Sequence, residues 1–205
     1  ATKTSGGWLM VQQQEEGVYP PPEDTRHSVD MARANQLGFP LALLLVVPLV
    51  VLHGLVRGWP AVGQAFEGFW GNLMLFLPAV LAGIVVHEVI HALTWGIFGG
   101  HGLRSVRIGF QWKTLTPFAH SMVPITAWSY RLGTAMPGLL TGIVPALAGS
   151  WAGMPELAGF GWFMTFCAGG DLLVLLLLRG VPANALVEDH PTRAGCRVLQ
   201  GPEPG

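Results

Sequence analysis

Four stretches of the chain are almost entirely apolar, and polar segments separate them. The first begins at Phe39 and reads FPLALLLVVPLVVLHGLV, and the others run from about 71 to 98, from about 132 to 151 and from 160 to 178. A helix needs about 20 apolar residues to cross the hydrocarbon core of a bilayer. Prolines inside such helices are tolerated where neighbouring groups satisfy the freed carbonyls. The pattern therefore predicts an all-α integral membrane protein with about four transmembrane helices.

The polar segments divide the chain into three regions. Residues 1–36, which include YPPPEDTRHS, are expected to form a cytosolic N-terminal tail, 37–180 the transmembrane domain, and 181–205 a cytosolic C-terminal tail. Between the second and third spans, SVRIGFQWKTL is rich in β-branched and aromatic residues. It predicts a short cytoplasmic strand or hairpin, whose edge could bind an extended substrate by β-addition. An amphipathic connector is the alternative.

The positive charges are sorted along the chain. Alternate segments carry nearly all of them, with the lysines and arginines at Lys3, Arg26 and Arg33, then Arg104, Arg107, Lys113 and Arg131, then Arg179, Arg193 and Arg197. Arg57 alone lies between the first and second spans, and none lies between the third and fourth. The positive-inside rule then predicts that both termini face the cytoplasm.

Composition supports lipid as the partner of the apolar surfaces. Only 11% of the 205 residues are charged, 51% are hydrophobic, and the mean hydropathy is +0.47. The net charge of -1 and the absence of a basic run argue against nucleic-acid binding. The two cysteines, Cys167 and Cys196, are too few for a disulfide framework or a sulfur-ligated zinc site.

The second span contains His87, Glu88 and His91 in the pattern H-E-x-x-H. Histidines at i and i+4 share one face of a helix, so both imidazoles can reach one ion. Ionisable groups within a span are costly and mark functional sites by default. We therefore predict a site for one zinc ion, with Glu88 as the general base. By contrast, the single His53 in the first span is interpreted as a packed core residue.

A catalytic zinc site takes three protein ligands, so a third must be found. Of the twelve acidic residues, only Glu88 and Asp171 lie inside predicted spans. Asp171 and His91 both lie roughly 10 Å from the cytoplasmic ends of their helices, at about 1.5 Å per residue. Asp171 is therefore the predicted third ligand. His120 is the rival, and His101 a weaker one.

Several of these segments resemble one known family. HEVIHALTWGIF, the segment KTLTPFAHSMVPITAWSYRLGTAMPGLLTGIVPAL, AGGDLLVLLLLR and LVEDHPTRAGCRV together are similar to the putative zincin peptidases, small bacterial membrane proteins. The resemblance extends roughly from Gly71 to Val198. It implies a zinc metallopeptidase of the bacterial inner or plasma membrane, with the roles of His87, His91 and Glu88 carried over.

A more remote similarity is to the site-2 proteases, in which an aspartate on a later span completes the metal site. Their motif around that aspartate is not reproduced, because Asp171 follows two glycines and precedes leucines. The polar stretch EDHPTRAGC, from Glu188 to Cys196, belongs to the family pattern but has no physical role evident from the sequence.

The predicted reaction is hydrolysis of a peptide bond in a peptide or membrane-protein substrate. His87, His91 and Asp171 would hold Zn²⁺, and Glu88 would take a proton from water and pass it to the leaving amine. Two other functions remain open from the sequence: a structural or regulatory metal site without turnover, and a metal-ion permease. A permease would place polar residues along several helices, and the first and third spans carry few.

Overall fold

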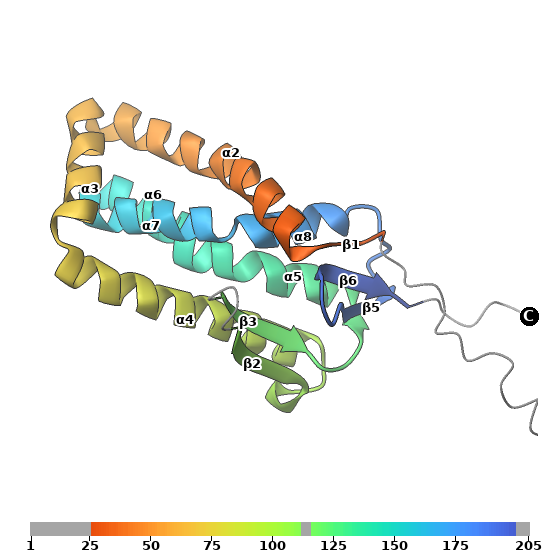
Figure 1. Ribbon diagram of the computed structural model, residues 1–205. Helices are drawn as coiled ribbons and strands as arrows, with labels where there is room; N and C mark the ends of the chain where they lie inside the picture. The colour runs from red at the N-terminus through yellow and green to blue at the C-terminus, as the bar shows by residue number, and fades with distance from the viewer. Residues whose placement is uncertain (1–25, 112–115, 200–205) are drawn as a thin grey trace, which may run out of the picture.

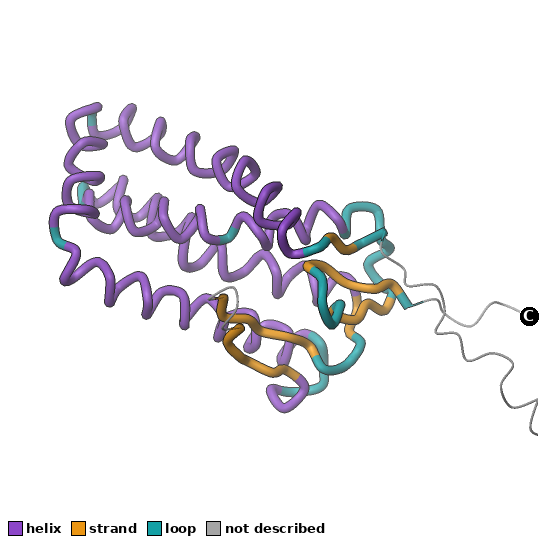
Figure 2. The backbone as a smooth tube through the Cα atoms, viewed as in Figure 1, coloured by secondary structure: helices purple, strands orange, loops and turns teal. Residues whose placement is uncertain are grey.

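The computed structural model describes residues 26–111 and 116–199. Long helices form one elongated body, and short strands gather at one of its ends (Figures 1 and 2). The α-helices are α2 (Met31–Arg57), α3 (Trp59–Gly71), α4 (Leu73–Phe98), α5 (Ala127–Pro137), α6 (Val144–Ala152), α7 (Pro155–Cys167) and α8 (Gly169–Leu177). A π-helical segment, Gly138–Ile143, joins α5 to α6, and a short 3₁₀ turn, Leu103–Ser105, follows α4.

Three of the helical segments are long and apolar enough to cross a membrane. They are α2, residues Phe76–Phe98 of α4, and the run Ala127–Ala152 that contains α5 and α6. Helices α7 and α8 are bent by 42° at a short break and form a fourth span if they are counted together. Each of the four predicted apolar stretches coincides with one of these elements to within a few residues at its ends, so the chain is a mostly helical membrane protein.

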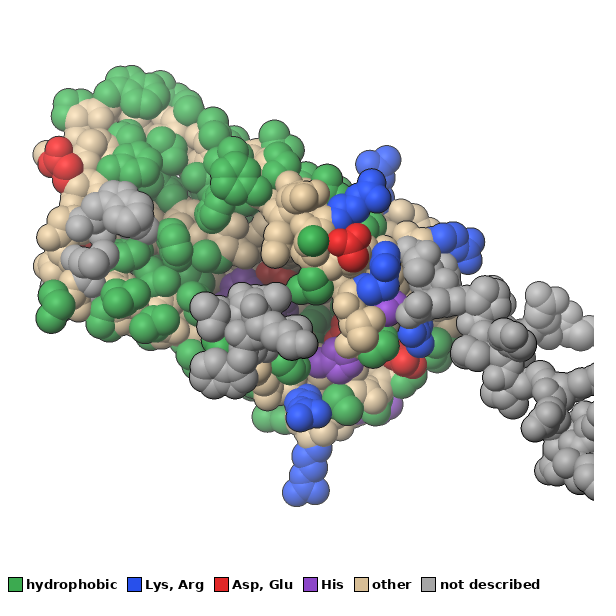
Figure 3. All heavy atoms as spheres, in the orientation of Figure 1, with side chains coloured by type: hydrophobic (Ala, Val, Ile, Leu, Met, Phe, Trp, Pro, Cys, Tyr) green, Lys and Arg blue, Asp and Glu red, His purple; other side chains and the backbone are tan. Residues whose placement is uncertain are grey.

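The outer surface of the helical body is apolar, as lipid contact requires. Large hydrophobic side chains are exposed along the helices, among them Leu44, Leu55 and Met74, and hydrophobic side chains cover the helical part of the face shown in Figure 3. Contiguous apolar exposure of this extent is rare in soluble monomers. The buried residues between the helices are mostly small, such as Ala42, Ala65, Ala146 and Ala158, which allows close helix approach without a hydrophobic driving force.

Helix α2 begins earlier than the apolar run predicts. Asp30 is its N-cap, and its Oδ1 accepts the backbone N–H of Arg33 at 2.9 Å. This bond satisfies one of the free donors of the first turn. The segment from Met31 to Gln36, which was expected to belong to the N-terminal tail, is therefore helical.

The predicted hairpin between the second and third spans is present. β2 (Val106–Gln111) pairs antiparallel with β3 (Thr116–Ser121), and Val106 lies opposite Ser121. Residues 112–115 of the predicted segment lie outside the described part of the chain.

A second sheet was not predicted. It is antiparallel, in the order β1 (Ser28–Val29), β6 (Ala194–Val198), β5 (Leu186–Asp189) and β4 (Ile125–Thr126). The C-terminal segment that was expected to be a tail thus pairs with residues close to the start of α2. These strands have only two to five residues, which is too short for a periodic signal in the sequence. A core that contains Trp95, Tyr130, Leu178, Val187 and Cys196 lies between this sheet and the helices.

His53 lies inside the helical body, far along α2 from the strands. It is 1% exposed, its Nδ1 lies 2.9 Å from Ser150 Oγ, and its ring meets Trp162 edge-on at 5.2 Å between centroids. These contacts agree with its interpretation as a packed core histidine.

Candidate metal centre

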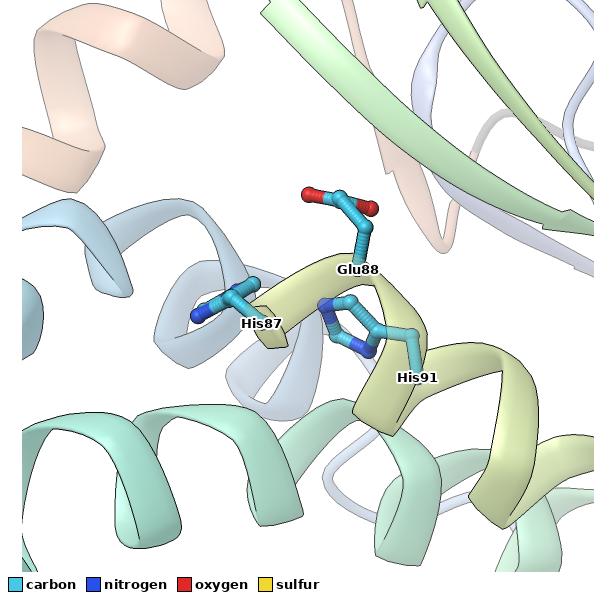
Figure 4. A group of neighbouring side chains, drawn as sticks. All are labelled: His87, Glu88 and His91. Carbon is cyan, nitrogen blue, oxygen red and sulfur yellow. The ribbon is translucent and has the colours of Figure 1, made fainter. Parts of the chain in front are cut away.

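His87, Glu88 and His91 lie on consecutive turns just past the middle of α4, and Figure 4 shows how the three side chains leave the helix. Their potential ligand atoms all lie within 4.8 Å of one another. The rings of His87 and His91 have centroids 4.9 Å apart, as the i, i+4 spacing requires. Both histidines are buried, at 7% and 5% exposure. The local helix therefore forms a compact group of potential metal ligands.

Asp171, in the first turn of α8, faces both histidines. Its Oδ2 lies 2.9 Å from His87 Nε2, and its Oδ1 lies 3.4 Å from His91 Nε2. Residues 84 positions apart in the sequence thus meet across two helices. Two imidazole nitrogens converge on one carboxylate, and this donor set is one that zinc uses in proteins.

Helix α8 is held close to its neighbours at both ends. A Cβ on Gly169 would lie 2.4 Å from the carbonyl oxygen of Gly38, so α2 approaches the start of α8 along glycine backbone. At the other end, Arg131 donates to the carbonyl of Leu178 at 2.6 Å and also to that of Val181. These contacts hold α8 against α2 and α5, and α5 in turn packs against α4.

His91 is oriented by a hydrogen bond on its other nitrogen. Nδ1 lies 2.9 Å from the carbonyl oxygen of Gly133, an acceptor, so Nδ1 carries the hydrogen and Nε2 keeps a free lone pair. The ring also stacks on Trp95 at 5.0 Å. A Cβ on Gly133 would lie 2.1 Å from Trp95, so only glycine leaves room for this arrangement. Trp95 follows His91 by four residues, so a helix places both rings on one face. This spacing is the sequence signal from which the stacking could have been predicted.

His87 has a nitrogen without a partner. Its Nδ1 is buried and makes no hydrogen bond within the described part of the structure, while Nε2 faces Asp171. A buried polar atom without a partner is costly in an apolar body. Two buried imidazoles, one of them incompletely satisfied, and a carboxylate between them fit a divalent metal ion.

Glu88 extends from α4 on a different side from the two rings (Figure 4). It is partly buried, and β3 packs against α4. Its carboxylate lies beside the two histidines without occupying the space between them and Asp171.

His120 and His101 lie elsewhere. His120, on β3, is partly buried, and its Nδ1 lies 3.5 Å from Asp189 Oδ2. His101 is exposed in the turn after α4. The group of potential metal ligands found among the described residues contains His87, Glu88 and His91, and neither His120, His101 nor Asp171 belongs to it. Asp171 differs from His120 and His101 because its carboxylate contacts both His87 and His91.

Asp189 is the centre of a second polar cluster. It is buried on β5, accepts the backbone N–H of Ser121 at 2.6 Å, and also accepts the Tyr130 hydroxyl. Burial raises the pKa of its carboxyl group, and the hydrogen bond from Tyr130 opposes that rise. No role for this residue could be predicted from the sequence, because its partners come from distant segments.

One family model matches the chain. It is described as "Putative zincin peptidase" and matches residues 80–186, slightly more than half of the chain. The matched range contains His87, Glu88, His91 and Asp171 and ends shortly before Asp189. The chain has no match among curated proteins or among solved structures.

Proposed function

This chain belongs to the family described as "Putative zincin peptidase", and on that premise we propose that it is a zinc-dependent metallopeptidase that hydrolyses peptide bonds at or within the membrane. One observation carries the proposal. Inside an apolar helical body, the two histidines of an H-E-x-x-H turn face a buried carboxylate from another helix. Ionisable groups gathered in such surroundings are expensive unless they serve a function.

We assign the ligands of one zinc ion to His87, His91 and Asp171. The hydrogen bond from His91 Nδ1 to Gly133 leaves Nε2 available, and Asp171 supplies the negative charge that a dication needs in low-dielectric surroundings. Zinc, when bound, supplies a Lewis acid that polarises a carbonyl group and makes water nucleophilic near neutral pH.

Glu88 is the proposed general base. It neighbours His87 in the sequence, and its carboxylate lies within 4.8 Å of the potential ligand atoms of His87 and His91. From this position it takes a proton from water and returns it to the leaving amine. A purely structural metal site would have no use for a carboxylate held beside the ligands, and this separates the proposal from a non-catalytic site or a permease.

The substrate of such a site is a peptide or a membrane protein with an extended segment. A peptide bond inside a helix is shielded by its own hydrogen bonds, so the substrate must be locally unwound where it reaches the site. Lipid covers the exposed apolar flanks of the body.

The metal itself provides the direct test. The purified full chain in detergent should contain about one zinc ion per molecule by elemental analysis, and it should cleave a fluorescence-quenched peptide. Because the metal is assigned an essential role, removal by a strong chelator should abolish cleavage, and added zinc should restore it. Cleavage that persists after complete metal removal would contradict the proposal.

We further propose that both termini face the cytoplasm. On the face shown in Figure 3, lysine and arginine side chains gather over the strand end, and the connections at the opposite end carry few positive charges. This distribution supports a cytoplasmic location for the strands.

Orientation can be tested by cysteine labelling. Gly63 on α3 has open space around it, and Met154 in the turn after α6 is 51% exposed, so cysteines there should react with an impermeant thiol reagent outside intact cells. Gly153 is unsuitable, because its φ is +71° and a Cβ would meet Arg57. The matched background replaces Cys167 and Cys196 with alanine. Labelling of both sites only after lysis would reverse the orientation.

A further inference from the structure

Arg57 is the one exception to the sorting of positive charges along the chain. No other lysine or arginine lies between Arg33 and Arg104. Arg57 is the last residue of α2, at the end of the body that is remote from the strands (Figure 1). Among the described residues, no ion pair or side-chain hydrogen bond involves its guanidinium group. A group that is always charged therefore lies at the boundary of the apolar body without an anionic partner from the described chain.

The guanidinium group of Arg57 lies between the ends of two helices. A Cβ on Gly153 would lie 2.7 Å from Arg57 Cζ, so the guanidinium rests on the glycine that follows α6. Gly153 has a φ of +71°, a backbone conformation that favours glycine and keeps this position free of a side chain. The contact brings the end of α2 and the end of α6 together. It places a positive charge at a defined point between the two helices.

An apolar groove leads from this charge along the same two helices. Its volume is about 810 Å³, within the range of about 300–1,000 Å³ that is typical of ligand sites. One lining residue, Val56, directly precedes Arg57, and another, Ala152, is the last residue of α6. The guanidinium group therefore lies at one end of the groove. Large apolar side chains form much of the remaining wall, namely Leu52, Val144, Leu147 and Trp151.

The polar groups of the groove are confined to its end. Ser150 also lines it, but this residue is 4% exposed. Its hydroxyl donates to the carbonyl of Ala146 at 2.7 Å, and its Oγ lies 2.9 Å from His53 Nδ1. Trp151, close to the end of α6, is 86% exposed, which leaves its indole N–H accessible. The groove therefore suits a hydrocarbon chain better than a peptide or a sugar, with polar contacts available where Arg57 lies.

The length of the groove matches one leaflet of a membrane. On α6 the lining residues extend from Val144 to Ala152, which is about 12 Å at about 1.5 Å per residue. One leaflet supplies half of a hydrocarbon core of about 30 Å. A spanning helix of a partner would contact the groove over less than half of its length. Helix interfaces in membranes also favour small residues, whereas the exposed walls here include Leu52 and Val56.

We propose that this groove binds one phospholipid, whose acyl chain lies between α2 and α6 and whose phosphate pairs with Arg57. A guanidinium group presents a planar fork of donors that matches the oxygens of a phosphate. Trp151 lies near the same end, and tryptophan is enriched at the level of the lipid headgroups. The site uses no residue of the metal centre, so it does not depend on the proposed peptidase function.

A charge variant tests the headgroup contact. With the full chain in a mild detergent, native mass spectrometry should detect one bound molecule of added phosphatidylglycerol. Arg57→Gln should weaken this binding by about tenfold or more, because it removes hydrogen bonds to a charged group. Arg179→Gln is the matched control, since Arg179 is exposed beyond α8, and it should bind the lipid like the parent. Equal binding by Arg57→Gln and the parent would show that the cation serves only the carbonyl ends of the helices, and it would overturn the proposal.

A second variant tests the acyl chain without changing any charge. Ala148 lines the groove and is exposed, so Ala148→Phe fills the groove without disturbing the buried core. It should weaken phosphatidylglycerol binding at least as much as Arg57→Gln does. Ala82→Phe, at an exposed position of α4 outside the groove, is the matched control and should bind like the parent. Unchanged binding by Ala148→Phe would refute the placement of the acyl chain.

Thermal unfolding and molecular mass complete the test. Phosphatidylglycerol should raise the Tm of the parent and of both controls, because a ligand that binds only the folded state stabilises it, and this rise should be smaller in Arg57→Gln and Ala148→Phe. A parent that binds no phospholipid would overturn the proposal. A parent dimer that Ala148→Phe converts to a monomer would do the same, because the groove would then be an interface between two copies of the chain. A parent that binds the lipid but cleaves no peptide would refute only the proposed function.

Discussion

Glu88→Gln is expected to lower kcat by about 10²–10⁴-fold while the protein keeps its zinc. Glutamine preserves the size of the side chain and can still accept a hydrogen bond through its amide oxygen. It cannot take up a proton, and general base catalysis commonly contributes a factor of this size. The measurement combines single-turnover peptide cleavage with elemental analysis of the same preparation.

Glu156→Gln is the matched control. Glu156 lies in the first turn of α7, is exposed, and is remote from the metal centre in the chain's fold. The same change of side chain there should leave kcat and zinc content at parent values. Full peptide cleavage by Glu88→Gln would contradict the role of Glu88 as general base.

Asp171→Ala is expected to lose zinc to a mild chelator far more readily than the parent. Even residues that only support a metal ligand contribute about 10–100-fold to affinity, so loss of a ligand should exceed that range. The substitution also removes the carboxylate between the two imidazoles, which leaves a dication with uncompensated charge in low-dielectric surroundings. Chelator titration followed by elemental analysis measures the change in affinity.

His120→Ala is the comparison that separates the two candidate ligands. His120 lies beside Asp189, whereas Asp171 contacts both His87 and His91, so the His120 variant should keep zinc with nearly parent affinity. The assignment would be reversed if His120→Ala lost the metal and Asp171→Ala retained it.

Some features of the metal centre follow from the local sequence, and others depend on how distant helices pack together. The i, i+4 spacing of His87 and His91 is local, and any helix there places both rings on one face. Asp171 could be selected because few carboxylates lie within apolar stretches, but its distance from the histidines depends on how α8 packs. That packing follows from the close approach of Gly38 and Gly169 and from the bond between Arg131 and the end of α8. The orienting acceptor, Gly133, has no side chain and gave no chemical signal.

The sequence by itself determined the helical membrane character, the hairpin between the second and third spans, and the histidine pair, because each arises from periodicity or composition within one segment. Only the tertiary structure decided the four-stranded sheet, the early start of α2 within a polar segment, and the contacts of Asp189. The sheet pairs Ser28 with Gly195, and Asp189 meets Tyr130 and Ser121 from other elements. Such contacts depend on the packing of distant segments, which leaves no periodic pattern in any one of them.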